Sequence, residues 1–511
     1  MTRESPENVL FVVLDTVRKD HLTPYGYDRS TTPGLDAFAE EATVFEQAVA
    51  PAPWTLPVHA SLFTGMYPSE HGADQETPYL DGATTLAQTL STAGYDTACY
   101  SSNAWITPYT HLTDGFDQQD NFFEVMPGEF LSGPLAKAWQ TLNDNEALRT
   151  IADKLVSLGN TAHEYLAGGE GADSKTPSVI DQTMEFVDDS EEFFAFVNLM
   201  DAHLPYHPPE EYVAEFAPGV DSTEVCQNSK EYNSGARDID DEEWEAIRGL
   251  YDAELAHMDD QLTRLFDWLK ETGRWDETMV VVCADHGELH GEHDLYGHEF
   301  GLYDPLINVP LMVKHPALDA ERRTDQVELV DLYHTVLDAL DVESAAATDG
   351  SVVQPDPTRS LLAGDYRNFE QAVNDDPGQR GDGEYAFVEY SRPVVELKQL
   401  EEKAASAGIS LSEDSRYYSR MRAARRPDAK YVRVDRIPDE GYRLDEDPDE
   451  TTNLAGEDDD RVEAVEETLA AFERDVGGAW TGAGGADVGD DSLEEFDEDT
   501  QERLRDLGYL E

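Results

Sequence analysis

The chain has 511 residues, with 36 Lys and Arg against 109 Asp and Glu, so its formal net charge is −73. This excess of negative charge argues against non-specific binding to nucleic acid or to anionic membranes, because both carry the same sign. Hydrophobic residues make up 40% of the chain, which is enough for a large core and excludes disorder of the whole chain.

The acidic residues are spread along the whole chain and are not confined to one tail. Concentrated salt weakens the repulsion between them, since the Debye length falls to about 3 Å at 1 M. The composition therefore predicts a halophilic protein, with an ordinary acidic protein as the alternative. It carries information about the protein's environment and none about its chemistry.

The apolar runs are too short to form the core of a signal peptide or to span a membrane. Val9–Leu14 comes directly after the N-terminal segment, and Met279–Ala284 is similarly short. Cys99, Cys226 and Cys283 are too few and too scattered for a disulfide framework or a cysteine-based metal site. We therefore expect a soluble, cytoplasmic protein that does not insert into membranes.

Short apolar runs alternate with amphipathic patterns through the first two thirds of the chain. We expect helices after Thr31, Thr55, Thr84, Ser178 and Asp240, and strands at Val9–Leu14, Thr97–Ser101, Phe193–Leu199, Met279–Ala284 and Pro310–Val313. The helix after Thr84 is expected to stop at Gly94. Because the strands lack polar alternation and are separated by helices, we predict an α/β fold with a mostly parallel central sheet covered by helices on both faces.

The composition changes after about residue 345. An Asp-, Gly- and Pro-rich stretch precedes strand-like pieces at Tyr385–Tyr390, Lys430–Val434 and Gly441–Leu444 and a helix near 460–475. Residues 477–495 are Gly- and Asp-rich and are expected to be flexible, with a short helix around Glu494–Leu507. We predict an α/β domain at 1–345, a linker at 346–385, a smaller C-terminal α+β subdomain at 386–476 and an acidic tail at 477–511.

Chemically suggestive side chains follow the first strands, where ligands bind in open α/β sheets. Asp15 ends the first strand and is placed to hold a metal ion, although an Asp there can also be a cap or turn residue. Thr55 precedes a helix with Pro57 in its first turn, so its hydroxyl faces free N–H groups and the positive end of the helix dipole. This environment favours an alkoxide, and the alternative is that Thr55 only caps the helix.

The densest cluster follows the strand at Met279–Val282. Asp285 and His286 are adjacent there and can reach one cation, with Gly287 allowing a sharp turn. Within thirteen residues lie His286, His290, His293 and His298, in a chain with only 14 histidines. This density favours a functional cluster over a solvated loop.

A further segment, Asn198 to His207, follows the strand at Phe193–Val197 and contains Asp201 and His203. Either His203 or His207 could be a loop residue packed on prolines, and for His207 packing is favoured. Together these segments bring Asp, Thr and His side chains to the ends of different strands. That pattern suits metal-assisted attack on a tetrahedral anionic ester.

The order of these residues resembles the alkaline phosphatase superfamily, in its sulfatase-like branch. The residues that carry the resemblance are Asp15, Thr55, His203, Asp285, His286 and His298, with Tyr25-Gly-Tyr27, Ser61-Leu-Phe-Thr-Gly65, Tyr67-Pro-Ser-Glu-His-Gly72, Asn308-Val-Pro-Leu-Met312 and Arg443–Leu454 as supporting segments. The resemblance runs from about residue 8 to 455. It implies an alkaline phosphatase-like fold with a smaller C-terminal subdomain and a metal-dependent ester hydrolase.

The chain departs from the sulfatase pattern at three places. Sulfatases carry Cys or Ser in a Cys/Ser-x-Pro-x-Arg segment and convert it to formylglycine, whereas this chain has Thr55 and, at the Arg position, His59. They have two adjacent Asp where it has Asp15-Thr16, and Asp-Asn where it has Asp285-His286. The nearest pattern is that of Thr-nucleophile phosphoethanolamine and glycerol-phosphate transferases, which share the Asp-His pair and a further His twelve residues on.

The resemblance and the chemistry together predict cleavage of phosphate mono- or diesters through a Thr55 nucleophile, by hydrolysis or by phosphotransfer. Asp15, Asp285 and His286 would hold a divalent metal ion, with the Thr55 oxygen completing its coordination. The donor set suits Zn or Mn, and a bias toward oxygen ligands would suit Mg or Ca.

The remaining histidines have open assignments. His203 and His298 would bind the ester oxygens or protonate the leaving group. His59 would contact substrate or pack in the core. A second metal ion, held by Asp201, His203, His207 or His298, is an alternative to a single one.

Three other functions stay open: a sulfuric ester hydrolase without formylglycine, a non-catalytic metal-binding member of the fold, and an isomerase resembling the cofactor-independent phosphoglycerate mutases. The isomerases have a large inserted domain, for which residues 115–190 are too short. The expected partner is a small-molecule or headgroup phosphate or sulfate ester, selected by the loops at 103–175, 204–240 and 345–385. No pattern predicts an oligomeric state.

Overall fold

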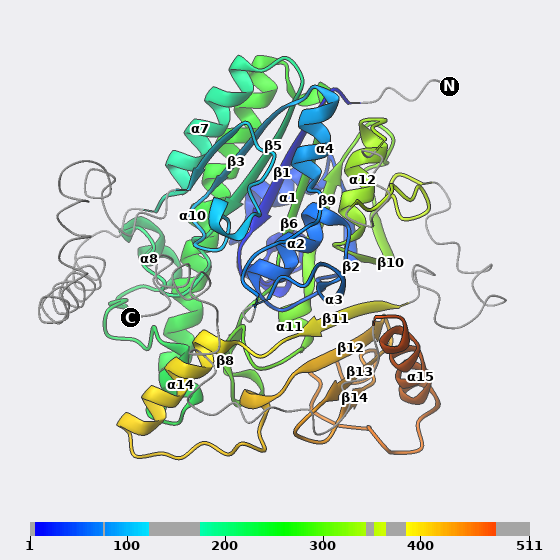
Figure 1. The fold of residues 1–511 in the computed structure, drawn as a ribbon. Coiled ribbons are helices and arrows are strands. Elements are labelled where there is room, and N and C mark those ends of the chain that lie inside the picture. Colours follow the sequence, from blue (N-terminus) through cyan, green and yellow to red (C-terminus); the bar gives the residue numbers. More distant parts are fainter. Residues whose placement is uncertain (1–5, 75–76, 122–173, 344–351, 364–384, 477–511) are drawn as a thin grey trace, which may run out of the picture.

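The computed structural model describes residues 6–74, 77–121, 174–343, 352–363 and 385–476 (Figure 1). Its largest element is an eight-stranded sheet with the order β10-β2-β9-β6-β1-β5-β3-β4. The strands of this sheet are β1 (Asn8–Leu14), β2 (Thr43–Val49), β3 (Asp96–Ser101), β4 (Gln118–Asn121), β5 (Phe193–Leu199), β6 (Thr278–Ala284), β9 (Asn308–Lys314) and β10 (Arg322–Glu328). A separate hairpin pairs β7 (Leu289–His290) with β8 (Tyr296–Gly297).

The prediction of a mostly parallel sheet is confirmed. All neighbouring pairs in the eight-stranded sheet are parallel except the two that β9 makes with β2 and β6. β1 lies between β5 and β6, and all of its residues are buried. A strand covered on both faces is expected to have this continuous apolar sequence.

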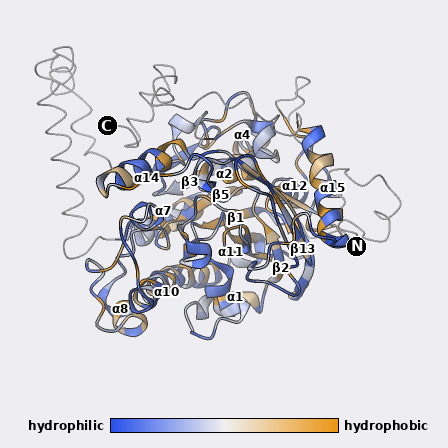
Figure 2. Ribbon diagram, turned by 90° about the horizontal axis from the view of Figure 1, so that it is seen from below, coloured by the Kyte–Doolittle hydropathy of each residue, from blue (hydrophilic) through white to orange (hydrophobic). Residues whose placement is uncertain are grey.

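Helices cover both faces of the sheet, as predicted. Figure 2 shows α1 and α10 on one side of it and α2, α4 and α12 on the other. The helices of this part are α1 (Pro33–Ala39), α2 (Thr55–Thr64), α3 (Pro68–His71), α4 (Leu86–Ala93), α7 (Thr176–Asp189), α8 (Glu210–Phe216), α9 (Ser229–Asn233), α10 (Asp241–Thr272), α11 (Asp304–Ile307) and α12 (Asp331–Ala339).

Local capping explains where two of these helices begin and end. Thr85 and Gln88 exchange side-chain hydrogen bonds with each other's backbone at the start of α4, which ends at the predicted Gly94 in the left-handed conformation (φ +106°). The long helix α10 begins after Asp240, whose carboxylate accepts the Glu243 N–H at 2.9 Å. It ends at Gly273, which is also left-handed (φ +78°).

A second, antiparallel sheet of four strands lies C-terminally, beyond one edge of the large sheet (Figure 1). Its strands are β11 (Ala386–Tyr390), β12 (Met421–Arg426), β13 (Ala429–Val434) and β14 (Glu440–Tyr442), with α14 (Val394–Ser406) and α15 (Asp460–Asp475) beside them. Helix α15 packs on β12 and β13, and its Phe472 stacks on Phe387 of β11 with ring centroids 4.2 Å apart. The three predicted strands and the helix near 460–475 are confirmed.

The sequence analysis missed four strands of these two sheets, β2, β4, β10 and β12. β10 is an edge strand with exposed charged residues, and β12 carries three charged side chains in the sequence Met-Arg-Ala-Ala-Arg-Arg. Arg422 and Arg425 in β12 are nevertheless buried, because they pair with Glu389 and Asp304. Charged residues can occupy a sheet interior only with such partners, which a single sequence does not show.

The predicted tail at 477–511, its helix at Glu494–Leu507 and most of the linker at 346–385 lie outside the described residues. The division into domains at these boundaries remains a prediction. Within the part of the chain that the structure describes, no helix combines the length and the apolar composition needed to cross a bilayer.

The net charge of −73 predicts a stability that depends on salt. We expect the midpoint of thermal unfolding to rise by about 10 °C or more between about 0.1 M and 3 M KCl, because screening shortens the Debye length from about 10 Å to below about 3 Å. Differential scanning calorimetry measures this midpoint, and a titration with sucrose controls for preferential exclusion of solute. A midpoint that does not rise with KCl would contradict the prediction.

Candidate active site

The predicted site residues follow neighbouring strands whose carboxyl ends meet at one edge of the large sheet. Leu14, the last residue of β1, pairs with Leu199 of β5 on one side and with Ala284 of β6 on the other. The segments after these three strands therefore start side by side. Asp15 follows β1 directly, and its N–H donates to the Leu199 carbonyl at 2.9 Å. Asp285 follows β6 in the same way.

Asp15, Asp285 and His286 form a buried group of potential metal ligands. Each of the three offers a ligand atom, and these atoms lie within 4.8 Å of one another. Oδ1 of Asp15 and Oδ2 of Asp285 are buried without a hydrogen-bond partner. His286 donates from Nδ1 to the Gly287 carbonyl at 3.0 Å, so the lone pair of its neutral form is at Nε2, 3.4 Å from Asp285 Oδ2.

The electrostatics of this group fit a divalent cation. Burial and the neighbouring Asp15 carboxylate raise the pKa of Asp285 well above its usual value. Burial also lowers the pKa of His286 well below its usual value, which keeps the ring neutral and able to ligate. A cation would compensate two buried carboxylates that otherwise repel each other, and two carboxylates with an imidazole suit Zn or Mn and also accept Mg or Ca.

Thr55 lies beside this group. It is the first residue of α2, and the N-cap position is occupied by Trp54, whose side chain makes no capping hydrogen bond, so capping does not explain Thr55. Its Oγ1 is 3.5 Å from His286 Nε2. The hydroxyl is therefore held next to the ligand group and at the positive end of the helix.

Asn103 connects the hydroxyl to the carboxylates and was missed in the sequence analysis. Its Nδ2 donates to Asp15 Oδ2 at 2.7 Å and to Thr55 Oγ1 at 3.3 Å. Asn198, at the end of β5, also donates to Asp15 Oδ2, at 3.2 Å. The signal that could have found Asn103 is its position just after the predicted strand Thr97–Ser101, at the same edge as the other site residues.

His59 lies in α2, one turn after Thr55, and is fully buried. Its Nδ1 donates to the Thr55 carbonyl at 2.9 Å and is 3.7 Å from Asp285 Oδ2. Burial lowers the pKa of His59 to about 4, although the Asp15 charge opposes this. The ring also contacts the rings of Phe63 and Phe196, so its contacts support the packing role.

The ring of His298 lies beside those of both His286 and His203. The His298 ring centroid is 4.6 Å from that of His286 and 5.3 Å from that of His203. His298 donates from Nδ1 to the fully buried Glu288 at 3.2 Å, which orients the ring. Burial opposes its protonation, but the carboxylates of Glu299 and Glu288 outweigh burial and raise the pKa of His298 to about 9. A cationic ring here can bind an oxyanion or give a proton to a leaving group.

Of the alternative ligands for a second metal ion, His203 and His298 are neighbours, whereas His207 and Asp201 have other partners. His207 bonds to the Ser222 hydroxyl at 3.0 Å, and Asp201 accepts from the hydroxyls of Ser174 and Thr176. Among the described residues, the one group of three metal-ligating side chains with atoms close enough for a shared ion is that of Asp15, Asp285 and His286.

The other histidines of the dense cluster have structural partners. His290 Nε2 is 3.0 Å from the Tyr206 hydroxyl, and His293 stacks on Tyr303 with ring centroids 3.5 Å apart. Of the histidines from 286 to 298, only the first and the last reach the candidate site. The number of histidines in this segment is therefore larger than the number that reach the candidate site.

Known proteins resemble this chain over most of its length. A family model described as Sulfatase matches residues 7–342. The multifunctional alkaline phosphatase superfamily protein PehA of Trinickia caryophylli is 26% identical over 89% of this chain and 92% of its own length. The choline-sulfatase of Rhizobium meliloti (strain 1021) is 24% identical over 92% of this chain and 86% of its own.

Solved structures show the same fold. The phosphonate monoester hydrolase of Agrobacterium radiobacter superimposes with a TM-score of 0.63 at 22% sequence identity, over 92% of this chain and 96% of the other. This structural match covers more of the chain than the family model, which ends at residue 342, and it therefore includes the C-terminal sheet.

Proposed function

The chain belongs to the sulfatase family and is accordingly a metal-dependent ester hydrolase, and from this premise we propose that it cleaves phosphate esters with Thr55 as the nucleophile. The observation that carries the proposal is the position of the Thr55 hydroxyl, which is 3.5 Å from His286 Nε2 and accepts a hydrogen bond from Asn103. An unmodified hydroxyl at the metal-ligand group is suited to direct attack on phosphorus.

The proposed reaction has two steps. The Thr55 hydroxyl loses its proton to water, Oγ1 attacks the phosphorus atom, an O–P bond forms, and the bond to the leaving alcohol breaks on the opposite side. His298 gives its proton to the leaving oxygen. Water, or a second alcohol, then gives a proton to His298 and attacks the phosphorus atom, the bond to Thr55 Oγ1 breaks, and phosphate or a new ester is released.

The surroundings of Thr55 favour the loss of its proton. The N-terminus of α2 and the Asn103 amide stabilise negative charge on Oγ1. A divalent cation held by Asp15, Asp285 and His286 would supply Lewis acidity, lowering the pKa of the hydroxyl and neutralising the non-bridging ester oxygens. Glu288 would keep His298 in the orientation needed for proton transfer.

The rival function is the hydrolysis of sulfate esters. Sulfatases use a formylglycine hydrate that releases sulfate by elimination, and a threonine cannot be converted to formylglycine. This difference favours phosphate esters. The relation to PehA, a superfamily protein described as multifunctional, supports the proposal, and the relation to a choline-sulfatase supports the rival.

A paired hydrolysis assay tests the proposal. Chelated protein in concentrated salt is supplied with Mn, Zn, Mg or Ca and offered p-nitrophenyl phosphate, bis-p-nitrophenyl phosphate and p-nitrophenyl sulfate. We expect turnover of at least one phosphate ester that depends on added metal and exceeds sulfate turnover at least tenfold. Turnover of the sulfate alone would overturn the proposal and favour the rival function.

A further inference from the structure

The residue that follows Asp15 has a strained backbone conformation. Thr16 is left-handed (φ +57°) and fully buried. Among the non-glycine residues with such a backbone in the described part of the chain, Thr16 is the only β-branched one. Branching at Cβ makes this conformation a steric outlier, so the surrounding contacts must hold the residue in it. Strain of this kind occurs most often at functional sites.

The backbone of Thr16 connects the two candidate carboxylate ligands. It follows Asp15 in the chain, and its N–H donates to Asp285 Oδ1 at 3.3 Å. The same oxygen accepts the His286 N–H at 2.9 Å. Two N–H groups therefore occupy Oδ1 of Asp285, and Oδ2 is left without a partner, like Oδ1 of Asp15. The conformation at residue 16 thus helps to determine which oxygen of Asp285 is free to bind a cation.

A tyrosine of α10 holds the other side of this residue. The Tyr251 hydroxyl donates to the Thr16 carbonyl at 2.9 Å and accepts the Arg18 N–H at 2.8 Å. One hydroxyl thus bonds to the chain on both sides of Val17 and closes the turn. Tyr251 and Thr16 are fully buried, so bulk water does not reach these groups to replace a lost hydrogen bond.

The remaining polar group of Thr16 acts only within the turn. Its Oγ1 donates to the carbonyl of its neighbour Asp15 at 2.7 Å, which does not connect the turn to the rest of the fold. That connection is made by Asp285 at the N–H and by Tyr251 at the carbonyl. Figure 2 shows α10, which carries Tyr251, on the side of the large sheet opposite to α2. The candidate site is therefore supported from both faces of the sheet.

We propose that Tyr251 is a positioning residue of the metal site. Its hydroxyl holds Thr16 in the left-handed conformation. Through that conformation it orients the free oxygens of Asp15 and Asp285 toward one shared cation. The inference concerns the same site as the proposed function, but it applies to phosphate and sulfate esters alike. Metal binding is measured without substrate, so either proposal can fail while the other stands.

Isothermal titration calorimetry of the chelated full-length protein with Mn or Zn tests the proposal without turnover. Tyr251→Phe removes the hydroxyl and keeps the ring. We expect this change to lower the affinity for the ion at least about tenfold, as is typical when a hydrogen bond that orients metal ligands is removed. Circular dichroism of the same samples shows whether the variant is folded.

The matched control is Tyr206→Phe. Tyr206 is also fully buried, and its ring centroid lies 5.5 Å from that of Tyr251. Its hydroxyl bonds to His290 at 3.0 Å, so this variant loses a buried hydrogen bond from the same aromatic cluster without touching Thr16. It should keep the affinity of the wild-type protein for the ion.

Thr16→Gly provides a readout that a purely structural role of Tyr251 would not change. Glycine adopts a positive φ without strain, so the hydroxyl is no longer needed to hold the turn. In a chain that carries Thr16→Gly, adding Tyr251→Phe should lower the affinity less than about threefold, in contrast to the loss of at least about tenfold in the chain with Thr16.

Three results would overturn the proposal: wild-type affinity in Tyr251→Phe, an equal loss in Tyr206→Phe, or an equal loss with and without Thr16→Gly. In the last case the hydroxyl would act through Arg18 or through packing. If Tyr251→Phe alone does not fold, the double variant decides. A folded double variant with the affinity of Thr16→Gly supports the proposal, and an unfolded one overturns it. A wild-type protein that binds neither ion would exclude the metal site and this inference together.

Discussion

Replacing Thr55 by alanine is expected to lower kcat/KM for phosphate esters by at least about 10³-fold, because the attacking oxygen is lost. The metal content should stay at the wild-type value, since Asp15, Asp285 and His286 are unchanged. Thr55→Ser, which keeps the hydroxyl, should retain activity within about 100-fold of wild type. Steady-state kinetics and elemental analysis of the same samples measure both quantities.

A matched control for this variant lies in the same helix. Thr64, at the other end of α2, is buried and donates from Oγ1 to the Ala60 carbonyl at 2.7 Å. Thr64→Ala removes a buried hydroxyl from α2 without touching the site, so it should keep wild-type kcat/KM even where it lowers the unfolding midpoint. A Thr55→Ala protein as active as Thr64→Ala would remove Thr55 from the mechanism.

The nucleophile step also has a direct chemical signature. Acid quenching of the wild-type protein during turnover should trap one phosphoryl group on the peptide that contains Thr55, which mass spectrometry detects. The label should be absent from Thr55→Ala. A wild-type protein that turns over phosphate esters yet is labelled at another residue would place the nucleophile there.

The convergence of the main site residues could be predicted from the sequence because it follows from topology. Asp15 and Asp285 come directly after apolar runs, and parallel strands bring their carboxyl ends to one edge. His286 follows from its adjacency to Asp285. Predicting the position of Thr55 requires one further inference, because that position depends on where α2 begins. Pro57 in the first turn indicated the start of this helix.

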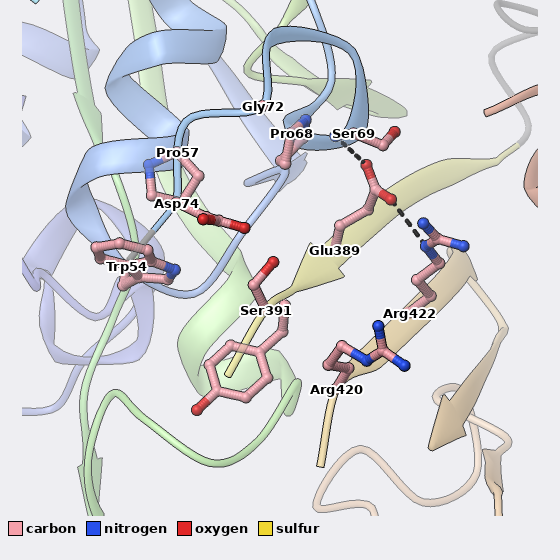
Figure 3. A pocket seen from close by; sticks show the side chains of 11 residues that line it. Trp54, Pro57, Pro68, Ser69, Gly72, Asp74, Glu389, Ser391, Arg420 and Arg422 are labelled. Atoms are coloured by element: carbon pink, nitrogen blue, oxygen red, sulfur yellow. Dashed lines mark hydrogen bonds and ion pairs between the residues drawn. The ribbon is translucent and has the colours of Figure 1, made fainter. Parts of the chain in front are cut away.

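What the sequence did not reveal depends on pairs that are distant in the chain. In the sequence, nothing distinguishes Asn103 from other polar loop residues. Its role follows from its hydrogen bonds to Asp15 and Thr55, which only the structure shows. Trp54, just before α2, and Glu389, in β11, line the same pocket although they are more than 300 residues apart in the chain (Figure 3). Arg422 lies in a strand that was not predicted, and its buried partner Glu389 lies on another strand. No local pattern encodes such partners, so they escape analysis of a single sequence.

Converting Asp285 to Asn is expected to abolish most metal binding and to reduce turnover at least about 10²-fold. The change is nearly isosteric. The remaining oxygen can still accept the N–H groups of His286 and Thr16, which Oδ1 accepts at 2.9 and 3.3 Å. Only the negative charge and one ligand oxygen are lost, so the fold should persist.

The same variant gives a second readout that does not depend on activity. Ligands that bind only the folded protein raise its unfolding midpoint, so added Mn or Zn should stabilise the wild-type protein and have little effect on Asp285→Asn. Without metal, the unfolding midpoint of the variant should equal or exceed that of the wild-type protein. The reason is that the variant no longer has two buried carboxylates, Asp15 and Asp285, facing each other. Calorimetric scans with and without metal measure all four midpoints. Equal metal-induced stabilisation of both proteins would exclude Asp285 as a ligand. If the variant then also unfolded at a lower temperature than the wild-type protein, the carboxylate would serve the fold alone.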